Sequence, residues 1–137
     1  MNYLLDTNVI SELYKPQGSE KVKTMIAGIP LENLYLSVIT LGEMSYGIER
    51  LPDSKKKHDL SLYLYSTIPG WFNNRIIPLE NELSFGWGRI RARVERTLPG
   101  LDSLIAATAI MHNMTLITGN TKDFEDIEGL ALLNPWD

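Results

Sequence analysis

Apolar residues along this chain form short runs that alternate with longer segments in which apolar positions recur at helical spacing. The short runs predict strands, the last of them weak, at Tyr3 to Leu5, Leu34 to Ile39, Arg75 to Ile77, Thr115 to Thr118 and Leu130 to Leu133. The longer segments predict helices at Val9 to Tyr14, Ser19 to Ala27, Thr40 to about Leu51, a stretch after Pro52-Asp53-Ser54 to about Ser66, Glu80 to Arg96 and Asp102 to Asn113. Strands separated by helices predict an α/β fold, in which an open, mainly parallel sheet of four or five strands is sandwiched between helices.

Length and composition favour one domain over residues 1–137, because no repeat, linker or low-complexity segment divides the chain. No apolar run approaches the roughly 18 residues that cross a bilayer, and the first residues do not resemble a secretory signal, so we expect a soluble, cytoplasmic protein. The absence of cysteine excludes disulfides, thiolate zinc sites and thiol nucleophiles. Any metal ion must therefore be held by oxygen or imidazole ligands.

Four carboxylates fall where ligands gather in an open parallel sheet, beyond the carboxyl ends of the strands. Asp6 directly follows the first predicted strand, and Glu43 lies in the first helical turn after the second. Asp123 lies a few residues beyond the strand ending at Thr118, and Asp102 begins the helix that leads into that strand. Neighbouring carboxylates repel one another unless a cation compensates them, and Mg²⁺, with Mn²⁺ as a substitute, suits an all-oxygen ligand set.

Each of these acids also has a purely structural explanation. Asp6 could cap the short helix that follows it, and Glu43 could form a capping box with Thr40. Asp102 could be an N-cap or a first-turn acid favoured by the helix dipole. Asp123 lies in a polar loop with other acids nearby, where aspartate is ordinary turn chemistry. The functional interpretation therefore depends on all four acids meeting at one edge of the sheet.

The formal charge of −4 at first disfavours a nucleic-acid partner, since such proteins usually carry a basic field. If four acids surround a cation, however, the remaining 13 acidic residues equal the 13 lysines and arginines. The rest of the surface would then be balanced, and the overall charge does not exclude RNA.

The whole chain resembles the PIN-domain ribonucleases, and most closely the VapC-like toxins of bacterial toxin–antitoxin pairs. The pieces that carry the resemblance are, in order, residues Leu4 to Glu12, Gly42 to Leu51, Asp102 to Ala109, Leu116 to Phe124 and Leu132 to Trp136. The resemblance implies that Asp6, Glu43, Asp102 and Asp123 form an acidic metal site, with Asn8, Thr118 and Asn120 as polar support. It also implies a homodimer held inactive by a cognate antitoxin. One departure is Gly119, where many similar sequences place arginine, and this puts an RNA phosphate contact at that position in doubt.

The chemistry that follows is metal-assisted hydrolysis of RNA phosphodiester bonds, and the resemblance implies 5′-phosphate and 3′-hydroxyl ends. A metal-free ribonuclease would need acid–base groups, most often histidine, but His58 and His112 lie outside the acidic motifs and suit surface or capping positions. Two other functions remain open. One is a phosphatase with Asp6 as nucleophile, although the residue two positions later is Asn8 rather than a second acid. The other is a non-catalytic RNA-binding or scaffolding domain whose acids only cap helices.

Arginines and aromatic residues are candidates for further contacts. Arg89, Arg93 and Arg96 share one face of the predicted helix, where they could bind RNA phosphates or form a solvated face that pairs with Glu95 and other acids. Lys55 to Lys57 suit an exposed helix start. We expect the aromatic residues of the second half to be buried in the core or in a dimer interface rather than to stack on bases: Trp71, Phe72, Phe85 and Trp87.

Overall fold

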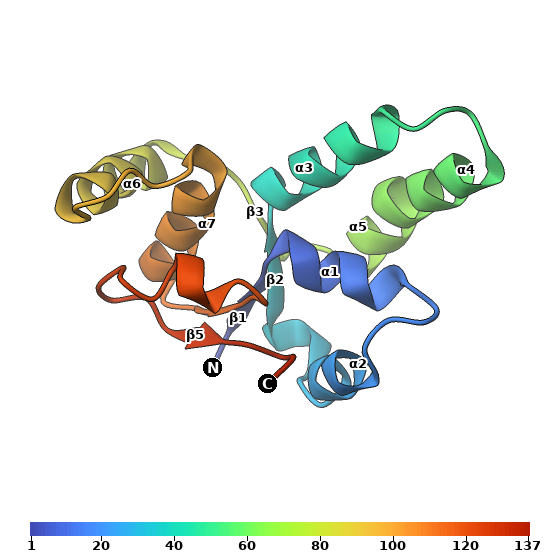
Figure 1. Cartoon of the computed structure of the whole chain (residues 1–137), viewed down its shortest axis with the longest axis horizontal. Coiled ribbons are helices and arrows are strands. Elements are labelled where there is room, and N and C mark those ends of the chain that lie inside the picture. The colour runs from blue at the N-terminus through green and yellow to red at the C-terminus, as the bar shows by residue number, and fades with distance from the viewer.

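The centre of the molecule is a five-stranded, all-parallel sheet with the strand order β3-β2-β1-β4-β5 (Figure 1). A computed structural model describes all residues, 1–137. Its strands are β1 (Tyr3–Leu5), β2 (Leu34–Ser37), β3 (Ile76–Ile77), β4 (Thr115–Ile117) and β5 (Leu132–Leu133). The predicted α/β class and the number of strands are confirmed.

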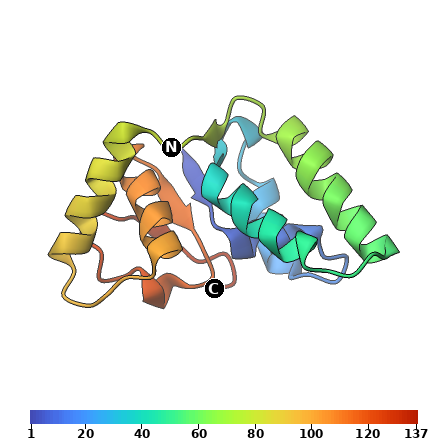
Figure 2. The same cartoon turned by 90° about the horizontal axis from the view of Figure 1, so that it is seen from above.

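Helices cover both faces of this sheet. In chain order the helical elements are α1 (Thr7–Tyr14), α2 (Glu20–Ala27), η1 (Leu31–Asn33), α3 (Val38–Glu49), α4 (Lys55–Leu62), η2 (Tyr63–Thr67), α5 (Ile68–Trp71), α6 (Asn81–Arg93), α7 (Gly100–Met111) and η3 (Thr121–Asp123). Helices α6 and α7 lie on one side, and α1 to α5 lie on the other (Figures 1 and 2). The longest helix has 13 residues, and none is long and apolar enough to cross a membrane.

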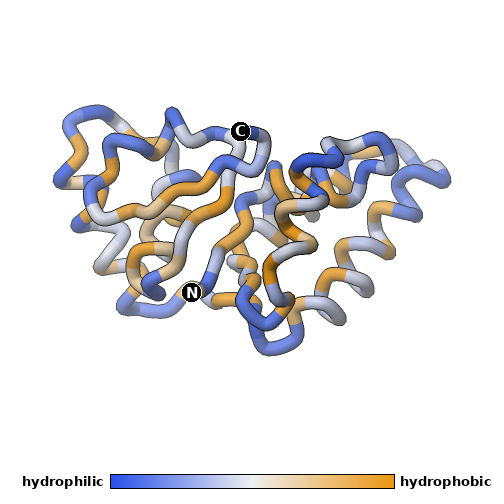
Figure 3. Tube along the Cα trace, turned by 90° about the horizontal axis from the view of Figure 1, so that it is seen from below, coloured by the Kyte–Doolittle hydropathy of each residue, from blue (hydrophilic) through white to orange (hydrophobic).

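The central strands are buried on both faces, which explains why they read as uninterrupted apolar runs. Leu4 and Leu5 are both fully buried, and they belong to two different apolar clusters on opposite sides of the sheet. Leu116 and Ile117 of β4 divide in the same way. Hydrophobic residues accordingly follow the central strands, whereas the connecting loops are mostly hydrophilic (Figure 3).

The junction between β2 and α3 differs from the prediction. The strand ends at Ser37 rather than Ile39, and the helix begins at Val38 rather than Thr40. The Ser37 hydroxyl accepts a hydrogen bond from the Ile39 amide at 3.0 Å and caps the helix. This cap outweighs the strand preference of the two β-branched residues that follow it. As a result Thr40 is buried inside the helix and cannot cap it, so the predicted capping box with Glu43 is wrong.

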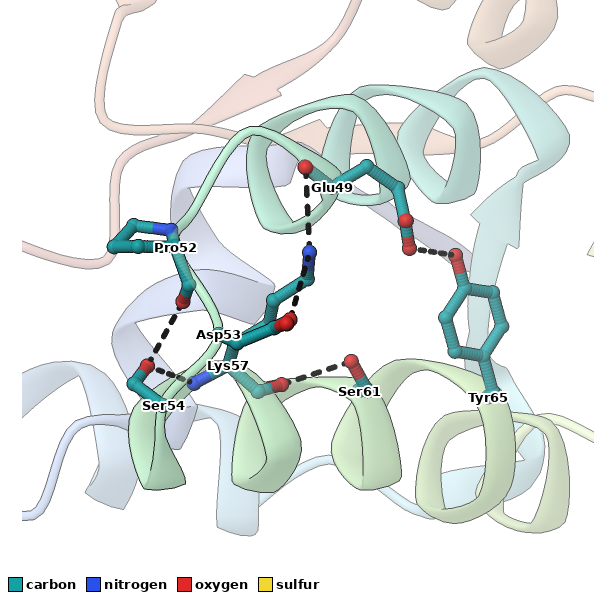
Figure 4. A network of polar contacts seen from close by, with 7 residues as sticks. All are labelled: Glu49, Pro52, Asp53, Ser54, Lys57, Ser61 and Tyr65. Carbon is teal, nitrogen blue, oxygen red and sulfur yellow. Dashed lines mark hydrogen bonds and ion pairs between the residues drawn. The ribbon is translucent and has the colours of Figure 1, made fainter.

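The connection from α3 to α4 is closed by a polar network (Figure 4). Ser54 accepts a hydrogen bond from the Lys57 amide at 3.1 Å and caps α4, while the Lys57 ammonium lies 3.4 Å from the Glu49 carbonyl oxygen and 3.9 Å from an Asp53 carboxylate oxygen. Helix α4 continues through the π-helical η2 into α5, beyond the predicted end near Ser66. The lysine segment begins a helix as predicted.

The predicted helix from Glu80 to Arg96 is shorter than expected. It runs from Asn81 to Arg93, and Val94 already has an extended backbone. Val94 and Leu98 both pack into the apolar cluster beneath α7, so the chain turns towards the core instead of continuing along the helix axis. Arg96 therefore lies in the connection between α6 and α7, and the prediction that it shares a helical face with Arg89 and Arg93 is wrong.

Candidate active site

Asp6 lies at the carboxyl end of β1, and its carboxylate is buried with several hydrogen-bond donors around it. One oxygen, Oδ1, accepts a bond from the Thr7 amide at 2.8 Å, so Asp6 also caps α1. The other, Oδ2, accepts bonds from the Thr118 hydroxyl at 2.8 Å and from the Asn8 side-chain amide at 3.3 Å. Burial raises the pKa of Asp6, although these hydrogen bonds oppose the shift. Asp6 can therefore cap α1 and take part in a binding site at the same time.

Asn8 and Thr118 tie the ends of β1 and β4 together. The Asn8 amide nitrogen donates to the Thr118 hydroxyl at 3.2 Å, and its carbonyl oxygen accepts from the Gly119 amide at 3.0 Å. Thr118 also accepts from the Asn120 backbone amide at 3.1 Å. Two of the three supporting residues implied by the family resemblance therefore contact Asp6 directly, whereas Asn120 contributes its backbone to the network.

Glu43 reaches the same edge of the sheet from the second turn of α3. Its Oε1 accepts a hydrogen bond from the Thr7 hydroxyl at 2.7 Å, and that hydroxyl lies 3.4 Å from the hydroxyl of Thr40. Thr7 follows Asp6 directly, so one residue at the start of α1 connects the first acid to the second. Thr7 is not among the site residues predicted from the sequence, because no local pattern pairs it with a carboxylate 36 positions away.

Asp102 lies in the first turn of α7 but does not cap that helix, whose N-cap position is Pro99. The pKa of Asp102 is raised, first by burial and then by the negative charges of Asp6, Asp123 and Glu43. Arg96 acts in the opposite direction. The other three acids named from the sequence therefore lie within electrostatic range of Asp102.

Asp123 comes from the short helical turn η3 on the outer side of this group, and it is exposed. Its backbone carbonyl accepts a hydrogen bond from an Arg96 Nη atom at 2.5 Å. The same guanidinium forms a two-point ion pair with Asp126, with Nε···Oδ2 at 2.7 Å and Nη···Oδ1 at 2.9 Å. Asp126 is another contact that the sequence analysis did not single out, because its partner is 30 residues away.

The four acids are gathered but not close-packed. No group of three or more acidic or histidine side chains has the spacing of direct ligands to one ion. Every donor is a carboxylate oxygen, and Mg²⁺ keeps several water ligands and takes only one or two protein carboxylates directly. The donor chemistry and the shared edge therefore fit a hydrated hard cation, with some carboxylates acting through water.

The arginines, histidines and aromatic residues considered in the sequence differ in their exposure to solvent. Arg89 and Arg93 are exposed on α6, and both histidines are exposed, with His112 at the C-cap of α7. Phe72 is in the core as expected, but Trp71 and Phe85 are exposed. The Trp87 indole N–H donates to the Ser103 hydroxyl at 2.7 Å, and the Arg91 guanidinium lies 4.8 Å above its ring. Trp87 thus supports the first turn of α7, beside Asp102.

Steric packing explains why position 119 is occupied by glycine in this fold. A Cβ atom at that position would come within 2.7 Å of the Trp136 ring, and the Gly119 carbonyl accepts a hydrogen bond from the Asn134 side chain at 3.3 Å. The Asn134-Pro135-Trp136 segment therefore packs directly on this glycine. An arginine, as in many similar sequences, would require Trp136 to move.

Comparison with known proteins identifies the family. The sequence model of the PIN domain matches residues 3–130. The chain is 37% identical to toxin FitB of Neisseria gonorrhoeae, over 97% of each chain, and 32% identical to a VapC ribonuclease of Sinorhizobium fredii, over 98% of this chain and 97% of that one. A solved structure of FitAB bound to a DNA fragment superposes with a TM-score of 0.92 at 37% identity, covering 98% of this chain and 96% of the other. The expectation from the sequence motifs is confirmed, and the chain belongs to the PIN domain family.

Proposed function

We propose that this protein is a divalent-metal-dependent endoribonuclease that hydrolyses RNA phosphodiester bonds, and that it is the toxin of a toxin–antitoxin pair. The observation that supports the proposal is that Asp6, Glu43 and Asp123, from three separate segments, all act electrostatically on Asp102, which comes from a fourth. Asp6 is the one acid of the four whose side chain caps a helix, whereas Asp102 lies in the first turn of α7 and Asp123 in a short turn, and helix capping leaves Glu43 unexplained. The names of the FitB and VapC relatives support the toxin and ribonuclease assignments.

The ion that we propose is Mg²⁺, with Mn²⁺ as a substitute, held by Asp6, Asp102, Glu43 and Asp123, directly or through water. When bound, such an ion lowers the pKa of a water molecule and stabilises charge on the attacked phosphate and the leaving oxygen. The resemblance to PIN-domain ribonucleases supports products with 5′-phosphate and 3′-hydroxyl ends.

The chain's own residues hold the acids in place before substrate arrives. Three donors fix the orientation of the Asp6 carboxylate, and the Thr7 hydroxyl fixes that of Glu43. Burial raises the pKa of Asp6, and burial together with the charges of the other three acids raises that of Asp102, so both negative charges are costly until a cation binds. The site is thus organised to favour positive charge at one point, which is the electrostatic requirement for binding an ion next to a phosphate.

The proposed partners follow from the same evidence. We propose that RNA is the substrate, that the chain forms a homodimer, and that a cognate antitoxin inhibits it. The solved FitAB assembly on DNA supports the pairing of this type of chain with a second protein.

A phosphatase with Asp6 as nucleophile is disfavoured by the geometry. Both Asp6 oxygens already accept hydrogen bonds, and the residue two positions later, Asn8, donates to that carboxylate instead of providing a proton-transfer acid. Asn8 is instead part of the lock between two strands.

The test is cleavage of a panel of structured RNAs with Mg²⁺ or Mn²⁺, with EDTA, and with the variants Asp6→Asn and Asp102→Asn. We expect activity with either ion, none with EDTA, and a loss of activity with each variant that is larger for Asp6→Asn. Activity that survives both substitutions would remove the acidic site from the mechanism. Products with 2′,3′-cyclic phosphates would indicate metal-free chemistry, and RNA binding without cleavage would favour the non-catalytic domain.

A further inference from the structure

Arg96 connects two loops at the outer side of the acidic site. It lies between α6 and α7, and its Nε and one Nη pair with both oxygens of the Asp126 carboxylate, at 2.7 and 2.9 Å. This parallel arrangement is the strong, directional form of an arginine–carboxylate contact. The same Nη atom also donates to the backbone carbonyl of Asp123. One side chain therefore holds both the backbone of a site residue and a carboxylate three positions after it.

The segment that Arg96 holds has little regular structure of its own. The turn η3 spans three residues, and its backbone bonds are local, from the Asp123 amide to Asn120 and from the Phe124 amide to Thr121. Phe124 and Ile127 are buried and anchor the segment to the core. Asp123 itself is exposed, and its backbone carbonyl accepts the hydrogen bond from Arg96 in the facing loop.

The pairing also decides what Arg96 can do towards RNA. The Nε–Nη edge is the part of a guanidinium that binds a phosphate at two points. In this structure that edge is occupied by Asp126. A two-point phosphate contact through this edge would have to break two hydrogen bonds to a carboxylate and release the Asp123 carbonyl, and only the second Nη atom of Arg96 remains without a partner.

The position of this charge suits the acids beside it. The Arg96 guanidinium lies within electrostatic range of Asp102 and Asp123. It therefore compensates part of the repulsion among the carboxylates without occupying the space among them. The Asp126 carboxylate in turn pairs with the guanidinium. The positive charge of Arg96 therefore stays at the loop instead of moving in among the acids.

We propose that Arg96 and Asp126 form a positioning pair that holds Asp123 at the acidic site, and that the paired Nε–Nη edge of Arg96 does not bind RNA phosphate. The part of this proposal that concerns ion binding and cleavage rests on the proposed function; the part that concerns the loop does not. Partners of this kind, one step removed from an ion, typically change metal affinity or activity by about 10- to 100-fold when they are lost.

The first measurement is hydrogen exchange of the peptide covering residues 120–128 in wild type, Arg96→Ala, Asp126→Ala and the double variant. We expect both single variants to raise exchange in this peptide by about 3- to 10-fold, and the double variant to exceed Arg96→Ala little, because Arg96→Ala already removes both the pair with Asp126 and the bond to the Asp123 carbonyl. Glu128→Ala and Lys21→Ala, which remove exposed charges without a recorded partner, are the matched controls and should leave the peptide unchanged.

The second measurement separates positioning from RNA binding. Mn²⁺ affinity without RNA, measured by titration calorimetry, should fall about 10-fold in both single variants, and kcat for RNA cleavage should fall with it while KM stays near the wild-type value. Arg96→Lys keeps the charge but cannot form the two-point contact, so it should rescue Mn²⁺ affinity only partly. Circular dichroism and thermal unfolding confirm that each variant is folded.

The decisive variant is Asp126→Ala, because it frees Arg96 for RNA. If Arg96 binds phosphate, this substitution should lower KM or leave cleavage unchanged, and either result would overturn the proposal. Unchanged exchange of residues 120–128 in Arg96→Ala would overturn it as well. If wild-type protein neither binds Mn²⁺ nor cleaves RNA, the proposed function fails, and the exchange measurement still decides whether the pair holds the loop.

Discussion

Apart from Glu43, which the Thr7 hydroxyl binds, the acidic site divides into two halves that are held by different kinds of contact. The strand-end half, Asp6 with Asn8 and Thr118, is buried at the ends of two adjacent strands and connected by side-chain hydrogen bonds. The outer half, Asp102 and Asp123, lies at a helix start and in a loop turn, and the structure records no hydrogen bond to either carboxylate. One half is thus positioned by the sheet itself, and the other by contacts between loops.

This difference shows how one site can combine rigidity with adaptability. Three hydrogen-bond donors fix the orientation of the Asp6 carboxylate before any ligand binds. Removing one of them would cost free energy, because it would leave a buried polar group without a partner. The carboxylates of the outer half remain free to adjust to an ion, its waters and a phosphate. Four sets of variants test whether the two halves behave as differently as their contacts indicate.

Exchanging the acid for its amide in each half should give the largest effect. Asp6→Asn should lower RNA cleavage by more than about 100-fold, since it removes the most firmly held carboxylate, whereas Asp123→Asn should lower it by about 10-fold because an outer acid can be replaced by water more easily. Both are measured as kcat/KM with Mn²⁺, with thermal unfolding as the control for folding. Equal losses for the two variants would contradict the division into a rigid and an adaptable half.

Removing one hydroxyl from each supporting contact tests the rigidity directly. Thr118→Val leaves buried partners unsatisfied around Asp6 and should destabilise the protein by about 1 to 3 kcal/mol. Thr7→Val removes a less buried hydrogen bond to Glu43 and should cost about 1 kcal/mol or less. Urea unfolding at neutral pH gives both values. A larger loss for Thr7→Val would show that the network at α3 matters more than the strand-end network.

The tight packing beside the strand-end half can be tested at Gly119. Gly119→Ala should destabilise the protein by about 1 to 2 kcal/mol, because the added methyl group meets the Trp136 ring. In a Trp136→Ala background the cost of the same methyl group should disappear. Gly88→Ala is the matched control, since a Cβ atom there meets nothing within 4 Å, and it should stabilise α6 by about 0.5 to 1 kcal/mol.

The smallest expected effect concerns pH. The pKa of Asp102 is raised from its ordinary value of 3.8, so the folded protein holds this proton to higher pH than the unfolded chain does. The contribution of Asp102 to stability should therefore decrease as pH rises from about 4 through the raised pKa; Asp6 acts in the same direction, and Glu12 and Asp126, whose pKa values are lowered, act in the opposite one. Asp102→Asn should flatten this decrease and gain up to about 1 kcal/mol at pH 7, a value that allows for screening by solvent. Thermal unfolding between pH 4 and 7 measures it.

The same experiment with Mn²⁺ provides the control. An ion that binds the folded state should raise the melting temperature of wild type at pH 7, and the rise should be smaller at pH 4, where carboxylates are protonated. Asp102→Asn should respond less to the ion. A wild-type protein that becomes more stable from pH 4 to 7 without metal would show that other groups outweigh the repulsion at this site.

Much of the fold was predictable from local patterns, and the errors have identifiable causes. The strand Tyr3 to Leu5 has the predicted bounds because a strand buried on both faces is an apolar run ended by a polar residue. The predicted start of α3 was wrong because Ser37 and Thr40 are equally plausible helix caps from sequence alone. The burial of Thr40 decides between them. The predicted end of α6 was wrong because the helical spacing of apolar residues does not reveal that Val94 and Leu98 turn into the core.

The sequence by itself determined the alternation of strands and helices, the family, and the identity of four acids at predicted strand ends or helix starts. The tertiary structure alone decided what holds those acids: Thr118 on Asp6 across 112 positions, Thr7 on Glu43 across 36, and Arg96 on Asp126 across 30. The physical reason is that hydrophobic periodicity and helix signals are local properties of the chain. Which donor faces which acceptor depends on how distant elements pack, and on where each helix stops.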